Sequence, residues 1–257
     1  MAAKKTHART TTSAEIEAAI EVFVAGFSQG RCRNWPHEYV RVGPLWCLRD
    51  APRNRAADYR KEEWIAYDIV PEVAHQTAKQ NTRGRYFICT VVELGESADE
   101  LRAQYKLLGY RLLATEPFFV HRLKRIPQFK SPVKIQVMKT AALAALLGKA
   151  TRTRPISADQ LANLPYRQYL AMENDNPVGW VRSVYTPLGN WCSHMYVQPE
   201  HRRRGIGKAL LSRMLRDDRK LGVTWNVLLS SHTGAMLYPA LGYEQIGMLY
   251  MFAPKKS

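Results

Sequence analysis

A short basic loop with two glycines is the part of the sequence whose residue types and spacing most directly suggest chemistry. It reads Arg202-Arg203-Arg204-Gly205-Ile206-Gly207-Lys208. The first N–H groups of a helix have no partner within the helix, and successive N–H groups at a tight turn form a concave anion site. Because glycine has no Cβ to block an approaching anion, the loop is expected to bind a pyrophosphate through its backbone.

Two predicted elements position this loop. The segment 190–197 is rich in β-favouring residues and stops shortly before Pro199, which predicts a strand. Apolar residues spaced three and four apart then predict an amphipathic helix that begins at the loop and reaches Lys220. The helix is expected to place these residues in the core: Ile206, Leu210, Leu211, Met214 and Leu215.

This order of strand, Pro199-Glu200, basic loop and helix resembles the GNAT acyl-CoA N-acyltransferases, whose pyrophosphate signature Arg202, Gly205 and Gly207 match. The stretch SHTGAMLYPALGYEQIG, residues 231–247, looks like the family's second signature, a helix that carries a tyrosine and ends in Leu-Gly-aromatic. The resemblance implies a mixed α/β (α+β) fold, with a central, mostly antiparallel sheet, splayed parallel strands and flanking helices. It also implies direct transfer of an acetyl group from acetyl-CoA to a primary amine in a ternary complex.

The resemblance further implies that acyl-CoA lies between the strands at 190–197 and 226–230. Main chain at 195–197 would bind the pantetheine arm and polarise the acetyl carbonyl, while the loop would hold the pyrophosphate. Ser231 stands where the family often has an asparagine that contacts the CoA arm. The residues expected to bind the cofactor are Met195, Tyr196, Val197, Arg202, Arg203, Arg204, Gly205, Ile206, Gly207, Lys208 and Ser231.

The resemblance assigns proton transfer less completely. Tyr238 matches the tyrosine that protonates the departing CoA thiolate. The alternative is a structural tyrosine packed in the core, because both would show the same sequence pattern. The family's usual base positions fall on Ser193 and Trp191, and neither residue is a base at neutral pH. Ser193 could order a water molecule. His194 is expected to point to the opposite face by strand alternation and to be structural, and His232 is no better supported, so the general base stays open.

An internal repeat predicts two related units. Tyr105-Lys-Leu-Leu-Gly-Tyr and Tyr238-Pro-Ala-Leu-Gly-Tyr share one pattern, and Phe119 and Phe252 follow at the same offset of 133 residues. Coincidence in a common helix-end motif is the alternative. The predicted organisation is a disordered tail at 1–12, a degenerate GNAT-like domain at 13–126 and an acetyl-CoA-binding domain at 127–257. Because the first unit has no Arg-x-x-Gly-x-Gly, only one acetyl-CoA site is expected.

The charge distribution bears on partners. The chain has 257 residues and a formal net charge of +16. Residues 129–257 hold 18 lysines and arginines against 7 acidic residues, whereas residues 1–128 hold 20 against 15. The excess in the second half is compatible with attraction of a polyanionic cofactor. Nucleic acid is possible but not favoured, because no basic patch is interleaved with aromatic residues.

Composition limits the location of the protein. No apolar run approaches the roughly 20 residues that a membrane span needs, and the N-terminus lacks the apolar segment of a signal peptide. The four cysteines are scattered without a Cys-x-x-Cys pair, which predicts reduced, mostly buried thiols and no metal site. We therefore expect a cytoplasmic protein without a membrane partner. The acceptor amine and the oligomeric state remain open, as do a non-catalytic acetyl-CoA sensor and a basic RNA-binding protein on the same scaffold.

Periodicity and turn residues predict the remaining elements. Helices are expected at 13–28, with Ser13 as N-cap, and at 72–80, 100–108 and 140–150; strands are expected at 85–93, 166–172, 178–185, 226–230 and 244–252. Apolar runs at 45–48 and 64–70 flank the charged segment 49–63, which is expected to be a hairpin-like excursion or a solvated surface loop. The segment 123–133 has two prolines and is the predicted linker.

Overall fold

A computed structural model describes residues 11–255 of the chain. The predicted tail at 1–12 falls mostly outside these residues, but Thr12 is described. The described part contains one sheet in the order β1-β2-β3-β4-β11-β5-β10-β9-β8-β7-β6. Its strands are β1 (His37–Val42), β2 (Leu45–Asp50), β3 (Glu62–Tyr67), β4 (Tyr86–Glu93), β5 (Tyr110–His121), β6 (Lys134–Val137), β7 (Tyr166–Glu173), β8 (Asn176–Tyr185), β9 (Asn190–Val197), β10 (Asn226–Leu229) and β11 (Glu244–Pro254).

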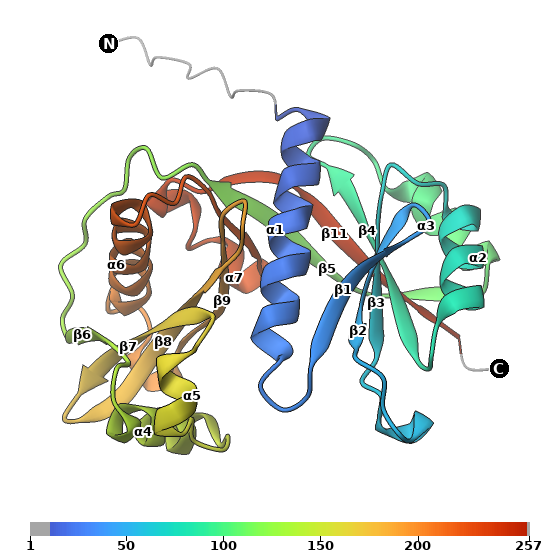
Figure 1. Cartoon of the computed structure of the whole chain (residues 1–257). Helices are drawn as coiled ribbons and strands as arrows, with labels where there is room; N and C mark the ends of the chain where they lie inside the picture. Colours follow the sequence, from blue (N-terminus) through green and yellow to red (C-terminus); the bar gives the residue numbers. More distant parts are fainter. Residues whose placement is uncertain (1–10, 256–257) are drawn as a thin grey trace, which may run out of the picture.

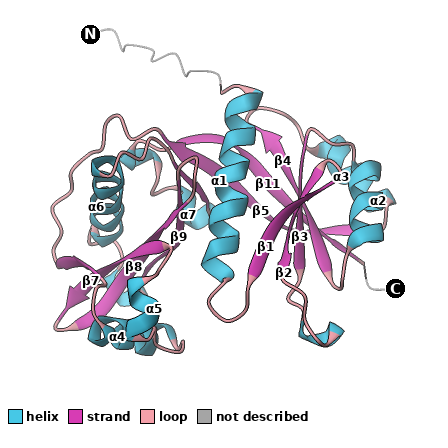
Figure 2. Cartoon of the chain, in the orientation of Figure 1, coloured by secondary structure: helices cyan, strands magenta, loops and turns pink. Residues whose placement is uncertain are grey.

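Helices cover both faces of this sheet (Figures 1 and 2). They are α1 (Ser13–Arg31), α2 (Pro71–Asn81), α3 (Asp99–Leu107), α4 (Ala141–Thr151), α5 (Ala158–Ala162), α6 (Ile206–Lys220) and α7 (His232–Ala235). Figure 1 shows α1 in the middle of the molecule, with α2 and α3 at one end and α4 to α6 at the other. The mixed α/β sheet flanked by helices confirms the predicted fold class.

Each half of the sheet contains one parallel pair of strands. The pairs β3–β4 and β9–β10 are parallel, and the other neighbouring strands pair antiparallel. At the centre, β5 pairs with β10 and β11 pairs with β4, while β5 and β11 pair with each other. The last strand of each half of the chain therefore lies against the other half.

Several local signals produce the expected elements. The helix α1 begins at Ser13 as predicted, but Thr12 rather than Ser13 is the N-cap and forms a capping box with Glu15. Asn174 and Asp175 have φ angles of 48° and 59° and connect β7 to β8 as a two-residue hairpin turn. The second signature forms only the short α7 and one turn of 3-10 helix at Pro239–Leu241, because Pro239 cannot continue an α-helix.

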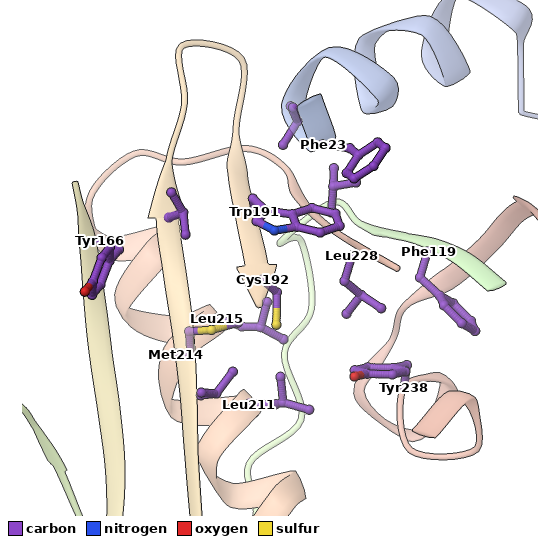
Figure 3. Packing of buried hydrophobic residues seen from close by; sticks show 14 of the residues in the cluster. Phe23, Phe119, Tyr166, Trp191, Cys192, Leu211, Met214, Leu215, Leu228 and Tyr238 are labelled. Atoms are coloured by element: carbon purple, nitrogen blue, oxygen red, sulfur yellow. The ribbon is translucent and has the colours of Figure 1, made fainter. Parts of the chain in front are cut away.

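The helix α1 packs tightly on the middle of the sheet. Phe23 lies 5.1 Å from the ring of Trp191 and 6.3 Å from that of Phe118, measured between centroids. Figure 3 shows Phe23 and Trp191 together, with Cys192 pointing away toward Leu211 and Leu215 of α6. We call the face of the sheet covered by α1 the α1 face. It places Trp191 of the second half and Phe118 of the first under one helix.

The other face is covered by α2 and α3 in the first half and by α6 in the second. A core under α2 and α3 includes Trp64, Tyr105 and Phe252, all with exposed fractions of 1% or less. The charged segment 49–63 is not simply solvated as expected, because Arg53 and Arg60 donate hydrogen bonds to the buried carboxylate of Asp50. Within the described residues, no helix is long and apolar enough to cross a membrane.

Candidate active site

The strands β9 and β10 diverge after a short parallel contact. They pair only at Asn190 with Asn226 and at Trp191 with Val227. Beyond this point β9 continues to Val197 while it remains paired with β8 on its other edge, and β10 remains paired with β5. Within the described part of the chain, the edge of β9 from Cys192 to Val197 therefore has no strand partner on the side facing β10, and its backbone groups can pair with an extended ligand.

The start of this opening is fixed by the buried carboxylate of Asp218 on α6. Asp218 has no exposed surface and pairs with the guanidinium of Arg167. Its oxygens also accept hydrogen bonds from Ser183 at 2.9 and 3.0 Å, from Asn190 at 3.0 Å and from Asn226 at 2.9 Å. Because Asn190 and Asn226 are the first pair of β9 and β10, Asp218 ties the helix to the point from which the two strands separate.

A β-bulge changes which side chains of β9 share a face. The register between β8 and β9 shifts between Trp180 and Arg182, and His194 has a φ of 53°, in the left-handed region. As a result Ser193 and His194 line the same cavity on the α1 face. The expectation that alternation points His194 to the opposite face is wrong, because the extra residue interrupts the two-residue period. Desolvation and, secondly, the charge of Arg182 lower the pKa of His194, so the imidazole is neutral at pH 7.

The basic loop forms the predicted entrance to α6. Gly205 is the N-cap with a φ of 83°, and Arg203 also has a positive φ of 62°. Within residues 11–255, the backbone N–H groups from Arg203 to Lys208 donate to no protein acceptor. Such a run of free donors at a helix N-terminus fits a pyrophosphate.

The two glycines serve different purposes. A Cβ at Gly205 would meet nothing within 4 Å, so glycine is needed there for its backbone conformation. A Cβ at Gly207 would lie 3.1 Å from Cε of Met195 and 3.4 Å from Cδ2 of Leu237. Gly207 therefore allows the first turn of α6 to pack closely on β9, which brings the loop next to the unpaired strand edge.

The three arginines of the loop are not equivalent. Arg202 donates from Nε to the carbonyl oxygen of Val197 at 3.0 Å and lies over the ring of Tyr196. Arg204 forms an ion pair with Glu173, which leaves less of its charge available to an anion. The Arg203 side chain has no hydrogen-bond partner among the described residues, so it is the arginine best placed to supplement the backbone donors. The ammonium of Lys208 lies over the ring of Phe129.

Tyr238 lies on the face opposite α1, beside Phe119 and Tyr243, with ring centroids 5.5 and 5.4 Å away (Figure 3). It is 6% exposed, and burial raises its pKa above the usual value, so its hydroxyl is protonated at neutral pH. Ser231 caps α7 by accepting a hydrogen bond from the N–H of Gly234, and Nε2 of His232 lies 2.7 Å from the hydroxyl of Thr115. These contacts give Ser231 and His232 local structural partners.

A cavity of about 410 Å³ lies between α1 and the α1 face, next to the point where β9 and β10 diverge. We call it the α1 cavity. It is lined by Phe23, Gly26, Phe27, Gly30, Arg31, Glu63, Cys89, Glu116, Trp191, Cys192, Ser193, His194, Leu229, Leu249 and Met251. Both halves of the chain contribute lining residues. Sequence reasoning missed Glu63 and Glu116, because they belong to no motif and only the strand arrangement brings them to Ser193.

The two carboxylates of the α1 cavity differ in their surroundings. Glu63 is 7% exposed and forms an ion pair with Arg31 at 3.3 Å. Desolvation raises the pKa of Glu63 to about 7 against the opposing charge of Arg31. Burial also raises the pKa of Glu116, which has no hydrogen bond or ion pair within the described residues. The hydroxyl oxygen of Ser193 is buried and likewise has no partner there. The described residues contain no cluster of metal-ligating side chains.

Comparisons with known proteins agree with this geometry. A family model for an acetyltransferase (GNAT) domain matches residues 165–245, from the end of the loop before β7 into β11. No curated protein matches the chain. A solved GCN5-related N-acetyltransferase from Kribbella flavida is 16% identical with a TM-score of 0.63, and the match covers 93% of this chain and 96% of that one.

Two further solved structures align over almost the whole chain. A GCN5-related N-acetyltransferase from Sphaerobacter thermophilus is 16% identical with a TM-score of 0.54, covering 92% of each chain. A putative GNAT acetyltransferase from Novosphingobium aromaticivorans is 15% identical with a TM-score of 0.53, covering 92% of this chain and 97% of that one. At such identities the similarity establishes the fold. Residues 165–245 therefore match a GNAT acetyltransferase domain, and the fold of the chain is that of solved GNAT proteins.

Proposed function

We propose that this protein is an N-acetyltransferase that binds acetyl-CoA in the opening between β9 and β10 and transfers the acetyl group to a primary amine. The observation that carries the proposal is the combination of an unpaired β9 edge with the free backbone donors at the start of α6. The strand edge suits an extended polar arm, and the donors suit its pyrophosphate. Acetyl-CoA would supply the activated acyl thioester.

Each part of the opening has a role in this proposal. The amides from Arg203 to Lys208 hold the pyrophosphate, and main chain at Met195–Val197 holds the pantetheine arm and polarises the carbonyl of the thioester. Tyr238 gives its hydroxyl proton to the departing thiolate as negative charge develops on the sulfur. Positioning of the amine supplies the remainder of the rate enhancement.

We also propose that residues 13–126 and 127–257 are two related units that have exchanged their last strands. Tyr105 stacks on Phe252 with centroids 4.2 Å apart, and Tyr238 packs on Phe119 at 5.5 Å, so each tyrosine of the repeat contacts the phenylalanine of the other unit. Gly109 and Gly242 both have positive φ angles at the same place in the repeat. In the first unit α2 begins at Pro71 after Val70 without a glycine loop, which leaves one acetyl-CoA site.

Substitution of Gly205 by aspartate is expected to weaken acetyl-CoA binding at least tenfold, or about 1.4 kcal/mol. Aspartate and asparagine have nearly the same shape and both tolerate the left-handed conformation, but only aspartate adds negative charge beside the pyrophosphate donors. Gly205→Asn is therefore the matched control. Isothermal titration of acetyl-CoA into the wild type and both variants measures the difference.

The outcomes of this titration separate the candidate functions. Binding by the wild type and Gly205→Asn, with loss in Gly205→Asp, supports an acetyl-CoA site at the loop. Binding without turnover of any amine would support a sensor. If the wild type bound no acetyl-CoA but bound RNA with a steep dependence on salt, the acetyltransferase proposal would be wrong.

A further inference from the structure

We propose that the α1 cavity holds the acceptor as a singly charged primary ammonium ion with a compact apolar body, and that Glu116 receives the proton the nitrogen loses before attack. This inference rests on the proposed acetyltransferase function. It assigns residues of the first half of the chain to the acceptor, although that half has no cofactor loop of its own.

The charges that line the cavity are unequal. Among its lining residues, Arg31 forms an ion pair with Glu63, and the imidazole of His194 is neutral. This leaves the carboxylate of Glu116 without a counterion among the described residues. A half-buried carboxylate without a partner is costly, and one ligand cation would offset that cost. The cavity therefore favours a single positive charge rather than a neutral or anionic acceptor.

The rest of the cavity surface is apolar. The rings of Phe23, Phe27 and Trp191 and the side chains of Leu249 and Met251 line it together with the polar groups. A volume of about 410 Å³ suits a small molecule, because ligand cavities commonly begin at roughly 300 Å³. Ser193 forms part of the cavity wall on β9, next to the opening proposed for acetyl-CoA. These features together select an arylalkyl or alkyl amine whose nitrogen points toward β9.

The raised pKa of Glu116 suits its proposed task. Its carboxylate binds a proton more readily than an exposed glutamate and can take one from an ammonium ion held against it. The neutral nitrogen then forms a bond to the acetyl carbon as the carbon–sulfur bond breaks. Tyr238 donates its hydroxyl proton to the thiolate. The second proton that the nitrogen loses then restores the hydroxyl of Tyr238. The products are an amide, a thiol and one proton that Glu116 releases to solvent.

The test uses phenethylamine as the probe and phenethyl alcohol as its uncharged counterpart. Each is titrated into the full chain, with and without saturating CoA. The wild type is expected to bind the amine at least tenfold more tightly than the alcohol, a difference of about 1.4 kcal/mol. Glu116→Gln removes the charge with little change of shape and is expected to abolish this preference. Glu96→Gln, on an exposed loop, removes the same charge outside the cavity and should behave like the wild type.

Turnover provides the second readout. With acetyl-CoA, the wild type is expected to acetylate phenethylamine with release of CoA thiol, and Glu116→Gln is expected to lower kcat at least about a hundredfold. Equal binding of amine and alcohol, or an unchanged amine preference in Glu116→Gln, would overturn the assignment. Glu116 does not line the β9 edge or the basic loop, so acetyl-CoA titration of the same variants reports on the proposed function separately. A failure confined to the amine titrations would leave that function intact.

Discussion

Replacement of Asp218 by alanine is expected to lower the free energy of unfolding by about 3 to 5 kcal/mol. The carboxylate is fully buried and accepts hydrogen bonds from Ser183, Asn190 and Asn226 in addition to its ion pair with Arg167. Its removal leaves the guanidinium of Arg167, which is mostly buried, without a counterion. The remaining donors lose their acceptor in a place with little access to water.

Asp217, the next residue of α6, provides the control. It pairs with Arg213 at 2.9 Å, where the Arg213 side chain is 41% exposed, and accepts a hydrogen bond from Tyr169 at 3.2 Å. Asp217→Ala is expected to cost only about 1 kcal/mol. Urea denaturation followed by circular dichroism measures both values. Equal losses for the two variants would contradict the role of Asp218 in holding β9 and β10 together.

Replacement of Glu63 by glutamine is expected to stabilise the protein at alkaline pH by up to about 3 kcal/mol. Burial raises the pKa of Glu63 from 4.5 to about 7 in the folded state. Between these two values the folded protein holds a proton that the unfolded chain has released, so the stability of the wild type falls as pH rises. Glutamine does not titrate, and the variant lacks this penalty.

The pH dependence distinguishes this explanation from a general packing effect. The stability difference between Glu63→Gln and the wild type should be smallest near about pH 4 and should reach its full value near about pH 8. Urea denaturation across this range measures it, with Glu96→Gln as a control for the loss of one surface charge. A difference that does not change with pH would show that Glu63 has an ordinary pKa in the folded protein.

The unit from Asn190 to Lys220 was the most predictable part of the molecule, because its signals are local. The strand bounds at 190–197 agree with the prediction, and α6 begins inside the basic loop as expected. Proline ends the strand, glycine takes the left-handed conformation at the helix start, and apolar spacing marks the buried side of the helix. Each signal lies within a few residues of the feature it specifies. The contacts of the listed cofactor and catalytic residues with substrate stay predictions.

Features that depend on a break in local regularity were not predictable in this way. Strand alternation put His194 on the wrong face, because no residue type in NWCSHMYV marks the bulge before the register of β8 is known. The edge strands β1 and β6 were missed, since each takes its stability from pairing with one neighbour, β2 for β1 and β7 for β6.

The α1 cavity depends on contacts that are distant in the sequence. Glu116 reaches the second half because β5 pairs with β10, and Glu63 reaches the cavity because α1 spans both groups of strands. From the sequence alone, a glutamate in a strand is expected to be exposed to solvent. Its burial becomes evident only when a helix is known to cover that face of the sheet. The repeat pattern indicated two units, but it did not indicate that their last strands lie against opposite partners.

Amide hydrogen exchange with and without acetyl-CoA tests the central claim most directly, because it reports where the cofactor binds without knowledge of the acceptor. We expect acetyl-CoA to slow exchange at residues 203–208 and along the unpaired edge of β9 at 192–197, and to leave the corresponding start of α2 at Pro71 unchanged. Protection confined to other parts of the chain, or no protection at saturating acetyl-CoA, would contradict the assignment of this opening as an acetyl-CoA site.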